Sequence, residues 1–224
     1  MSKQLGNSPD LLEMIEKDGA DAVRFGIMFS SPAGNDLMWD QAGNEQGRFF
    51  INKMWKALKL VKMWEARTTD SERPTTGNFA VEWFENRLAQ VRLELDEQFK
   101  DFRLSESLKT LYSLIWDDFC SWYLEWVKPG FEQTIDKAVY EKTVGFFEEL
   151  MQLLHPFLPF ITEEIYHQLK ERADDLTIKQ YPYAGNSDKN ILASGILLKE
   201  VITAIRDTRN KNQLKPKVTI KLYI

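Results

Sequence analysis

The stretch NEQGRFFINKMWKALKLVKMWE, residues 44–65, carries the pattern that decides the fold. Its apolar side chains recur at intervals of three and four residues, which places them along one face of a helix. Lysines and other polar side chains fill the positions between them. The segment is therefore expected to be a long amphipathic helix with one face in a core. The apolar positions are Phe50, Ile51, Met54, Trp55, Leu58, Val61 and Met63.

Most of the remaining chain repeats this helical pattern. Ser8 and Pro9 are residue types of an N-cap and a first helical turn, and Gly19 is a type that ends a helix. Pro129 and Gly130 end a later helix in the same way. Helices are expected over residues 9–18, 21–29, 44–65, 79–102, 104–127, 138–154, 159–172 and 189–211.

Two short stretches near the C-terminal end favour strands instead. They are TIKQYP, residues 177–182, and KVTIKLYI, residues 217–224, in which polar and apolar residues alternate. A lone strand cannot bury its apolar face, so the second stretch is expected to pair with the first or with a segment beyond this chain. The expected fold class is mainly α, a helical bundle with a small β/α appendage at the C-terminal end.

Composition limits the possible functions. The chain has 224 residues, a formal net charge of −5, one cysteine and two histidines. Cys120 alone excludes an internal disulfide framework and a cysteine metal cluster, and no metal site is predicted. No signal peptide and no apolar stretch of about 20 residues is visible, so no membrane contact and a cytoplasmic location are expected. Most of the large aromatic residues are interpreted as core, as is Cys120. The cluster so interpreted is Trp116, Phe119, Cys120, Trp122 and Tyr123.

The helix over residues 44–65 also carries a row of cations. Lys53, Lys56, Lys59 and Lys62 recur every third residue with no acid between them, and Arg48 precedes them. In an acidic protein such a local row is suited to nucleic-acid phosphates. A plain solvated helix face is the alternative. The end of the chain is a second basic stretch, for which an RNA-stem contact and a solvated tail are both open. Its cations are Arg206, Arg209, Lys211, Lys215, Lys217 and Lys221.

The N-terminal stretch MSKQLGN, residues 1–7, has the residue types of a phosphate-binding loop. Lys3 is a flexible cation, Ser2 supplies a hydroxyl donor, and Gly6 permits a tight turn. These residues alone are weak support, because a lysine near a glycine is common by chance.

Several motifs in order resemble class I aminoacyl-tRNA synthetases. Met1, Ser2 and Lys3 match part of the Lys-Met-Ser-Lys-Ser loop of that family, with Gln4 in place of its final serine. The later motifs resemble the valyl branch, although Phe49 stands where that branch has asparagine. His155-Pro156 differs from the isoleucyl and leucyl relatives. The matching stretches are GADAVRF, SSPAGNDLMWD, GRFFINKMWKAL, WFENRL, WDDFCSWYLEWVKP and LLHPFLPFITEEIYHQL.

The resemblance implies that this chain is a piece of a longer enzyme. Residues 1–40 would end its catalytic region, 41–175 would be the anticodon-binding bundle, and 176–224 a truncated α/β subregion. Lys3, with Met1 and Ser2, would contact ATP phosphates, and ATP with Mg²⁺ would serve the complete enzyme. The chain itself is expected to hold no catalytic residue, to bind no cofactor and to be inactive.

The resemblance also implies a partner, tRNA(Val), and a monomer without an obligate protein partner. Arg48, Asn52 and Lys53 fall in the helix that resembles the valyl anticodon contact, and Lys56 and Lys59 extend the same row. The implied tRNA-binding residues are therefore these five. Two alternatives stay open: the anticodon domain of an isoleucyl or leucyl enzyme, and a helical adaptor that binds protein partners.

Overall fold

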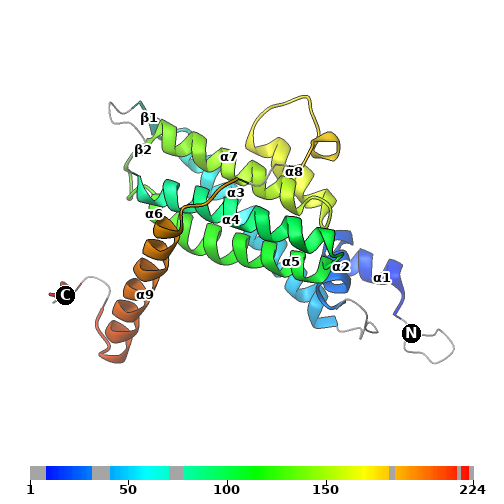
Figure 1. The fold of residues 1–224 in the computed structure, drawn as a ribbon, viewed down its shortest axis with the longest axis horizontal. Coiled ribbons are helices and arrows are strands. Elements are labelled where there is room, and N and C mark those ends of the chain that lie inside the picture. The colour runs from blue at the N-terminus through cyan, green and yellow to red at the C-terminus, as the bar shows by residue number, and fades with distance from the viewer. Residues whose placement is uncertain (1–8, 32–40, 71–77, 182–184, 216–217, 222–224) are drawn as a thin grey trace. The chain divides into compact units, whose positions relative to one another are not determined.

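The computed structural model describes residues 9–31, 41–70, 78–181, 185–215 and 218–221. These residues form a mainly helical fold, as predicted from the sequence (Figure 1). The α-helices are α1 Leu11–Asp18, α2 Ala20–Phe29, α3 Gln41–Glu65, α4 Phe79–Lys100, α5 Leu104–Ser113, α6 Leu124–Val127, α7 Lys137–Leu154, α8 Pro159–Leu169 and α9 Lys189–Lys211. Between α5 and α6 lies the π-helix η2, Leu114–Tyr123, and after α8 the 3₁₀-helix η3, Leu176–Ile178.

The chain divides into two compact units, Met1–Asn186 and Ser187–Ile224. In the first unit, the long helices α3, α4, α5 and α7 form a bundle (Figure 1). The second unit contains α9, of which only Gly195 is buried. The domain boundaries predicted after residues 40 and 175 stay predictions.

Aromatic side chains fill the core of the bundle. The Phe84 ring of α4 lies 5.3 Å from the Phe119 ring, 4.9 Å from Tyr123 and 5.1 Å from Phe146, measured between centroids. Phe84, Phe119 and Tyr123 are fully buried. Such pairs contribute about 0.5–1.5 kcal/mol each beyond the burial of their area. The core role predicted for Phe119 and Tyr123 is confirmed.

The predicted strands are wrong where the structure describes them. Residues 176–178 form η3 rather than a strand, and residues 218–221 have no strand assignment. The β-structure lies elsewhere: β1, Thr68–Thr69, pairs in parallel with β2, Ile135–Asp136. The alternating pattern failed because strand formation needs a neighbouring strand, and none meets either stretch in the described part of the chain. Residues 217 and 222–224 lie outside the described residues.

Capping side chains set where several helices begin. Asp10 accepts a hydrogen bond from the backbone N–H of Leu12 (2.8 Å) and is the N-cap of α1. The sequence predicts Ser8 as this cap, and Ser8 lies outside the described residues. Asn78, Asp136 and Asp188 cap α4, α7 and α9 in the same way. Such caps satisfy N–H groups that have no partner within the helix. Gly19, with φ +86°, ends α1 in a conformation that glycine adopts without strain.

Two side chains of α2 fasten it to the turn between α7 and α8. The buried Asp21 carboxylate accepts from the N–H of Ile161 (2.6 Å) and of Phe160 (3.4 Å) at the start of α8. Arg24 donates to the carbonyls of Phe157 (2.9 Å) and Pro156 (3.0 Å). The two bonds to Asp21 satisfy N–H groups in the first turn of α8, where a negative charge is also favoured.

The helix expected over 104–127 is continuous, but its middle is the π-helix η2. The N–H of Leu124, for example, bonds the carbonyl of Phe119, five residues back. This wider turn changes which residues share a face. Trp116 and Trp122 are half-buried, so the prediction that they lie in the core is wrong in degree. None of the helices in the described ranges has the length and apolar character needed to cross a membrane.

Candidate nucleic-acid interface

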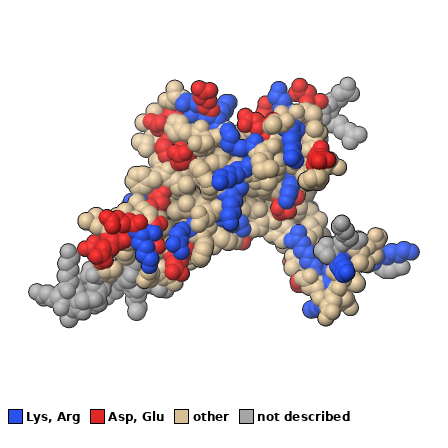
Figure 2. Space-filling model, turned by 180° about the vertical axis from the view of Figure 1, so that it is seen from behind, with Lys and Arg blue, Asp and Glu red and all other residues tan. Residues whose placement is uncertain are grey.

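One face of α3 carries the cations predicted from the sequence. Arg48, Asn52, Lys56 and Lys59 are spaced by three and four residues, so they lie on one side of the helix, and all four are exposed. Lys53 lies at the edge of this face and is half-buried. Figure 2 views the side on which α3 lies, behind α4 and α7 in Figure 1, and shows Lys and Arg side chains gathered across its middle. Local charge here is positive although the chain is acidic.

A groove runs beside this face. It has a volume of about 610 Å³ and lies between α3 and the helix formed by η2 and α6. Its walls combine cations, an amide, two aromatic rings and aliphatic side chains. The lining residues are Phe49, Asn52, Lys53, Lys56, Ala57, Leu60, Trp116, Cys120 and Leu124.

Lys53 is held in place by the far wall of the groove. Its Nζ donates to Ser121 Oγ (2.9 Å) and lies 4.1 Å from the centroid of the Trp116 ring. Ser121 Oγ in turn donates to the Trp116 carbonyl (2.8 Å). An ammonium over an indole is attracted by the ring's quadrupole. Lys53 therefore offers an anion a fixed charge, with N–H donors left over beyond the one that Ser121 uses.

Lys56 and Lys59 differ from the other cations of α3. Neither has a carboxylate within 4.0 Å among the described residues. Arg48, by contrast, faces Asp18 of α1, with Nη1 3.9 Å from Oδ1. Lys62 donates to the Gln168 carbonyl in the last turn of α8 (2.9 Å), where a cation also matches the helix dipole. Lys56 and Lys59 are thus the cations of α3 best placed for an external phosphate.

The groove also exposes aromatic surface. Phe49 is 56% exposed at its rim, and Trp116 stacks on Tyr112 with ring centroids 5.5 Å apart. Tyr112 in turn contacts Phe50 (4.9 Å), which fixes Trp116 to the core. Rings beside cations are what unstacked nucleobases and their phosphates need. Sequence reasoning missed Trp116 and Phe49 as site residues, because it assigned Trp116 to the core and set Phe49 aside as a departure from the family pattern.

Cys120 lines the groove without being reactive. Burial raises the pKa of its thiol to about 12, and nearby Lys53 only partly opposes this shift. The thiol therefore stays protonated at neutral pH, and the thiolate is the nucleophilic form. This agrees with the interpretation of Cys120 as an apolar packing residue.

The other predicted contacts belong to other segments of the chain. Met1, Ser2, Lys3 and the ATP loop they would form lie outside the described residues. Near the C-terminal end, Arg209 donates to the carbonyls of Val218 (3.0 Å) and Lys215 (2.6 Å), so it fixes a turn. The described residues also hold one cluster of metal-ligand type, which lies on α8 and the segment after it.

A family profile and individual relatives connect this geometry to known proteins. The family described as "Anticodon-binding domain of tRNA ligase" matches residues 81–224, well over half of the chain. The chain belongs to this family. The match begins in α4, so α3 lies outside it, whereas the similarity to the relatives below includes α3.

Individual relatives of the chain are valine–tRNA ligases. Those of Phocaeicola vulgatus and Porphyromonas gingivalis are 47% and 48% identical over 100% and 99% of this chain. That of Bdellovibrio bacteriovorus is 36% identical over 100% of it. The chain spans about a quarter of the length of these relatives, 26–27%.

A solved structure shares the fold. A chain in the crystal structure of the LeuRS–tRNA–LeuAMS ternary complex of Agrobacterium radiobacter K84 superposes with a TM-score of 0.60. It is 18% identical, and the match covers 86% of this chain and 22% of that one. At this identity the likeness concerns the fold alone.

Proposed function

We propose that this chain binds the anticodon arm of a tRNA along the exposed face of α3. The observation that carries the proposal is the juxtaposition of Lys56 and Lys59, which have no carboxylate partner in the described residues, with a groove rimmed by Phe49 and walled by Trp116. Lys56 and Lys59 bind backbone phosphates, and Phe49 provides a surface on which an unstacked base lies. Asn52, exposed at the same rim, offers donors and an acceptor to base edges.

Lys53 and Arg48 have more constrained parts in this proposal. Lys53 contributes a positioned charge while Ser121 and the Trp116 ring hold it in place. Arg48 balances the buried Asp18 carboxylate, whose side chain is 3% exposed, and reaches RNA only with the N–H groups that face outward. The main phosphate contacts are thus assigned to Lys56 and Lys59.

For the whole protein, we propose the activity of the relatives: attachment of valine to tRNA(Val) with ATP and Mg²⁺. The relatives are valine–tRNA ligases, and their similarity extends along the whole chain, which supports this activity. Lys3 would contact ATP phosphates there, together with Met1 and Ser2. The chain by itself is proposed to be a monomeric, non-catalytic tRNA-binding part of a cytoplasmic enzyme.

The test is a salt titration of tRNA binding by matched variants. We expect tRNA(Val) to bind the wild-type chain more tightly than tRNA(Ile) or tRNA(Leu). Replacing Lys56 and Lys59 together by alanine should weaken binding and reduce the slope of log K against log salt by about 1.4–1.8, since each phosphate contact contributes about 0.7–0.9. Lys100→Ala removes one charge from α4, where Lys100 pairs with Asp96 (2.6 Å), and should change neither quantity.

Three outcomes would contradict the proposal. A loss in the Lys100 variant that equals, per charge removed, the loss in the double α3 variant would mean that only net charge matters. An unchanged salt slope in the double variant would place the phosphates elsewhere. Absence of tRNA binding at low salt would leave the cations of α3 as a solvated face, as in a protein-binding helical adaptor.

A further inference from the structure

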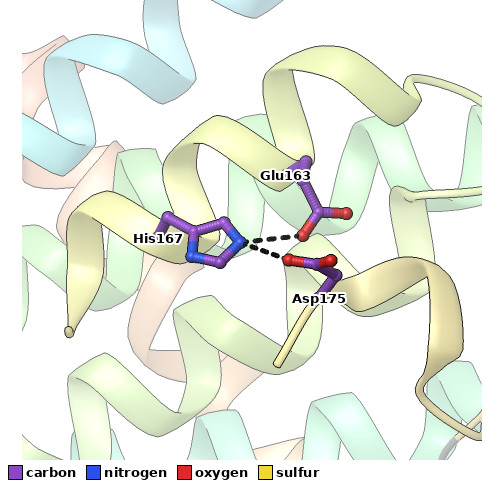
Figure 3. Close-up of side chains that lie close together, drawn as sticks. All are labelled: Glu163, His167 and Asp175. Carbon is purple, nitrogen blue, oxygen red and sulfur yellow. Dashed lines mark hydrogen bonds and ion pairs between the residues drawn. The ribbon is translucent and has the colours of Figure 1, made fainter. Parts of the chain in front are cut away.

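Both histidines of the chain lie beside Glu163 of α8, His155 from the turn before the helix and His167 from its last turn. His167 and Glu163 are four residues apart on α8, so their side chains share a face. The segment after α8 returns Asp175 to the same face. Figure 3 shows the imidazole of His167 pointing between the two carboxylates. None of these three residues lines the groove beside α3.

The two distances from His167 to the carboxylates are close to those between ligands of one metal ion. His167 Nε2 lies 3.3 Å from Glu163 Oε1 and 2.9 Å from Asp175 Oδ1, and the three ligand atoms all lie within 4.8 Å of one another. Ligands bound at about 2.0–2.2 Å to a common ion are separated by roughly 3.0–3.5 Å in octahedral or tetrahedral geometry. Little movement is therefore needed to admit an ion.

The surroundings orient these ligands. The backbone N–H of Leu176 donates to Glu163 Oε1 (2.8 Å), which fixes that carboxylate. His155 Nε2 lies 3.8 Å from the other oxygen of Glu163, while its ring bonds Thr162 (2.9 Å) and Thr177 (3.1 Å). The side chains of His167 and Asp175 are 37% and 62% exposed, so an ion and its remaining waters can reach the site.

We propose that Glu163, His167 and Asp175 bind one divalent transition-metal ion, with Zn²⁺ as the ion best matched to them. One imidazole with two carboxylates suits Zn²⁺, Co²⁺ and Ni²⁺ better than Mg²⁺, which prefers oxygen ligands. The ion joins α8 to the segment that carries Asp175. Its binding therefore stabilises the chain, because the unfolded chain does not hold the three ligands together. The sequence alone predicts no metal site, since two histidines 12 positions apart, His155 and His167, give no ligand motif.

The experiment titrates the chain, free of any affinity tag, with ZnCl₂ by calorimetry and records thermal unfolding with and without excess ZnCl₂. We expect one ion per chain and a higher Tm, reversed by EDTA, while MgCl₂ has no such effect. Glu163→Gln should weaken Zn²⁺ binding at least about tenfold, since even indirect partners of metal ligands change affinity about 10–100-fold. Glu164→Gln, the same change one residue along α8, should leave it unchanged.

His167→Gln separates metal binding from the hydrogen bonds of the trio. A glutamine amide still donates to a carboxylate but is a poor ligand for Zn²⁺, so this variant should keep the apo Tm within a few degrees and lose Zn²⁺ binding. Three results would overturn the proposal: no Zn²⁺ binding by the wild type, undiminished binding by His167→Gln, or equal losses in Glu163→Gln and Glu164→Gln. Glu163, His167 and Asp175 would then only hold the segment after α8 against the helix by hydrogen bonds.

Discussion

Tyr123 and Thr143 share a buried hydrogen bond whose direction can be tested by replacing each residue. Tyr123 and Thr143 are both 0% exposed, and their oxygens lie 2.7 Å apart. Thr143 donates its own proton to the Val139 carbonyl (2.8 Å), so Tyr123 is the donor of the shared bond. Burial raises the pKa of Tyr123, and the phenol stays protonated through the neutral range. Each hydroxyl thus has a definite role in one short chain of hydrogen bonds.

The two single replacements should differ in cost. Tyr123→Phe removes the donor and leaves Thr143 bonded to Val139, so the loss is about 0.5–1.5 kcal/mol, the net value of one hydrogen bond. Thr143→Val keeps the side-chain shape but leaves the Tyr123 hydroxyl buried without its acceptor. That desolvated group costs about 1–3 kcal/mol. In the double variant no unpaired hydroxyl remains, so its loss should be smaller than the sum of the two.

The assay is urea unfolding followed by circular dichroism and tryptophan fluorescence, with all four proteins compared at one pH. The interaction energy from the cycle should exceed the additivity limit of about 0.3–0.5 kcal/mol for independent sites. Tyr140→Phe is the control, because Tyr140 lies near the surface of the same bundle and is half-buried. Additive losses, or a Thr143→Val loss no larger than that of Tyr123→Phe, would refute the assigned donor direction.

Three other features of the fold predict changes in stability. Gly47→Ala should destabilise the chain by about 1–3 kcal/mol in urea unfolding, because an added Cβ would lie 2.9 Å from the Ala22 carbonyl oxygen. Gly145→Ala should instead stabilise it by about 0.5–1 kcal/mol, because an added Cβ there meets no atom within 4 Å. Asp21→Ala should cost about 0.5–2 kcal/mol and increase amide exchange in the first turn of α8, and unchanged exchange there would contradict its role as acceptor. Burial raises the pKa of Cys120 from 9.0 to about 12, so between these pH values the unfolded chain binds fewer protons than the folded chain. Stability should therefore fall as the pH rises from 9.0 to about 12, and it should fall more in the wild type than in Cys120→Ala.

The sequence determined the helices well because the signals that form them are local. The apolar period of residues 44–65 acts between neighbouring turns of one helix, and the helix it predicts is observed as α3. The failed strands 177–182 and 217–224 show the converse, since a strand is stable only against a partner that its own sequence does not name.

The sequence also predicts only part of the candidate site. The spacing of Lys53, Lys56 and Lys59 placed three cations along α3, because helical periodicity alone sets which positions share a face. The sequence could not show that Lys53 is held by Ser121, 68 residues later, or that Trp116 forms the opposite wall of a groove. Trp116 lies in the π-helix η2, which the helical pattern of the sequence does not predict.

What the sequence by itself determined is therefore the set of helices, the charged face of α3 and the resemblance to a synthetase family. Only the tertiary structure decided which cations face open solvent, which aromatics reach the surface, and that Asp175 returns to Glu163 and His167. The physical reason is the separation along the chain of the residues that interact. Caps and periodicity act between neighbours in the chain, whereas grooves and ligand clusters arise between segments whose approach is set by burial of the whole core.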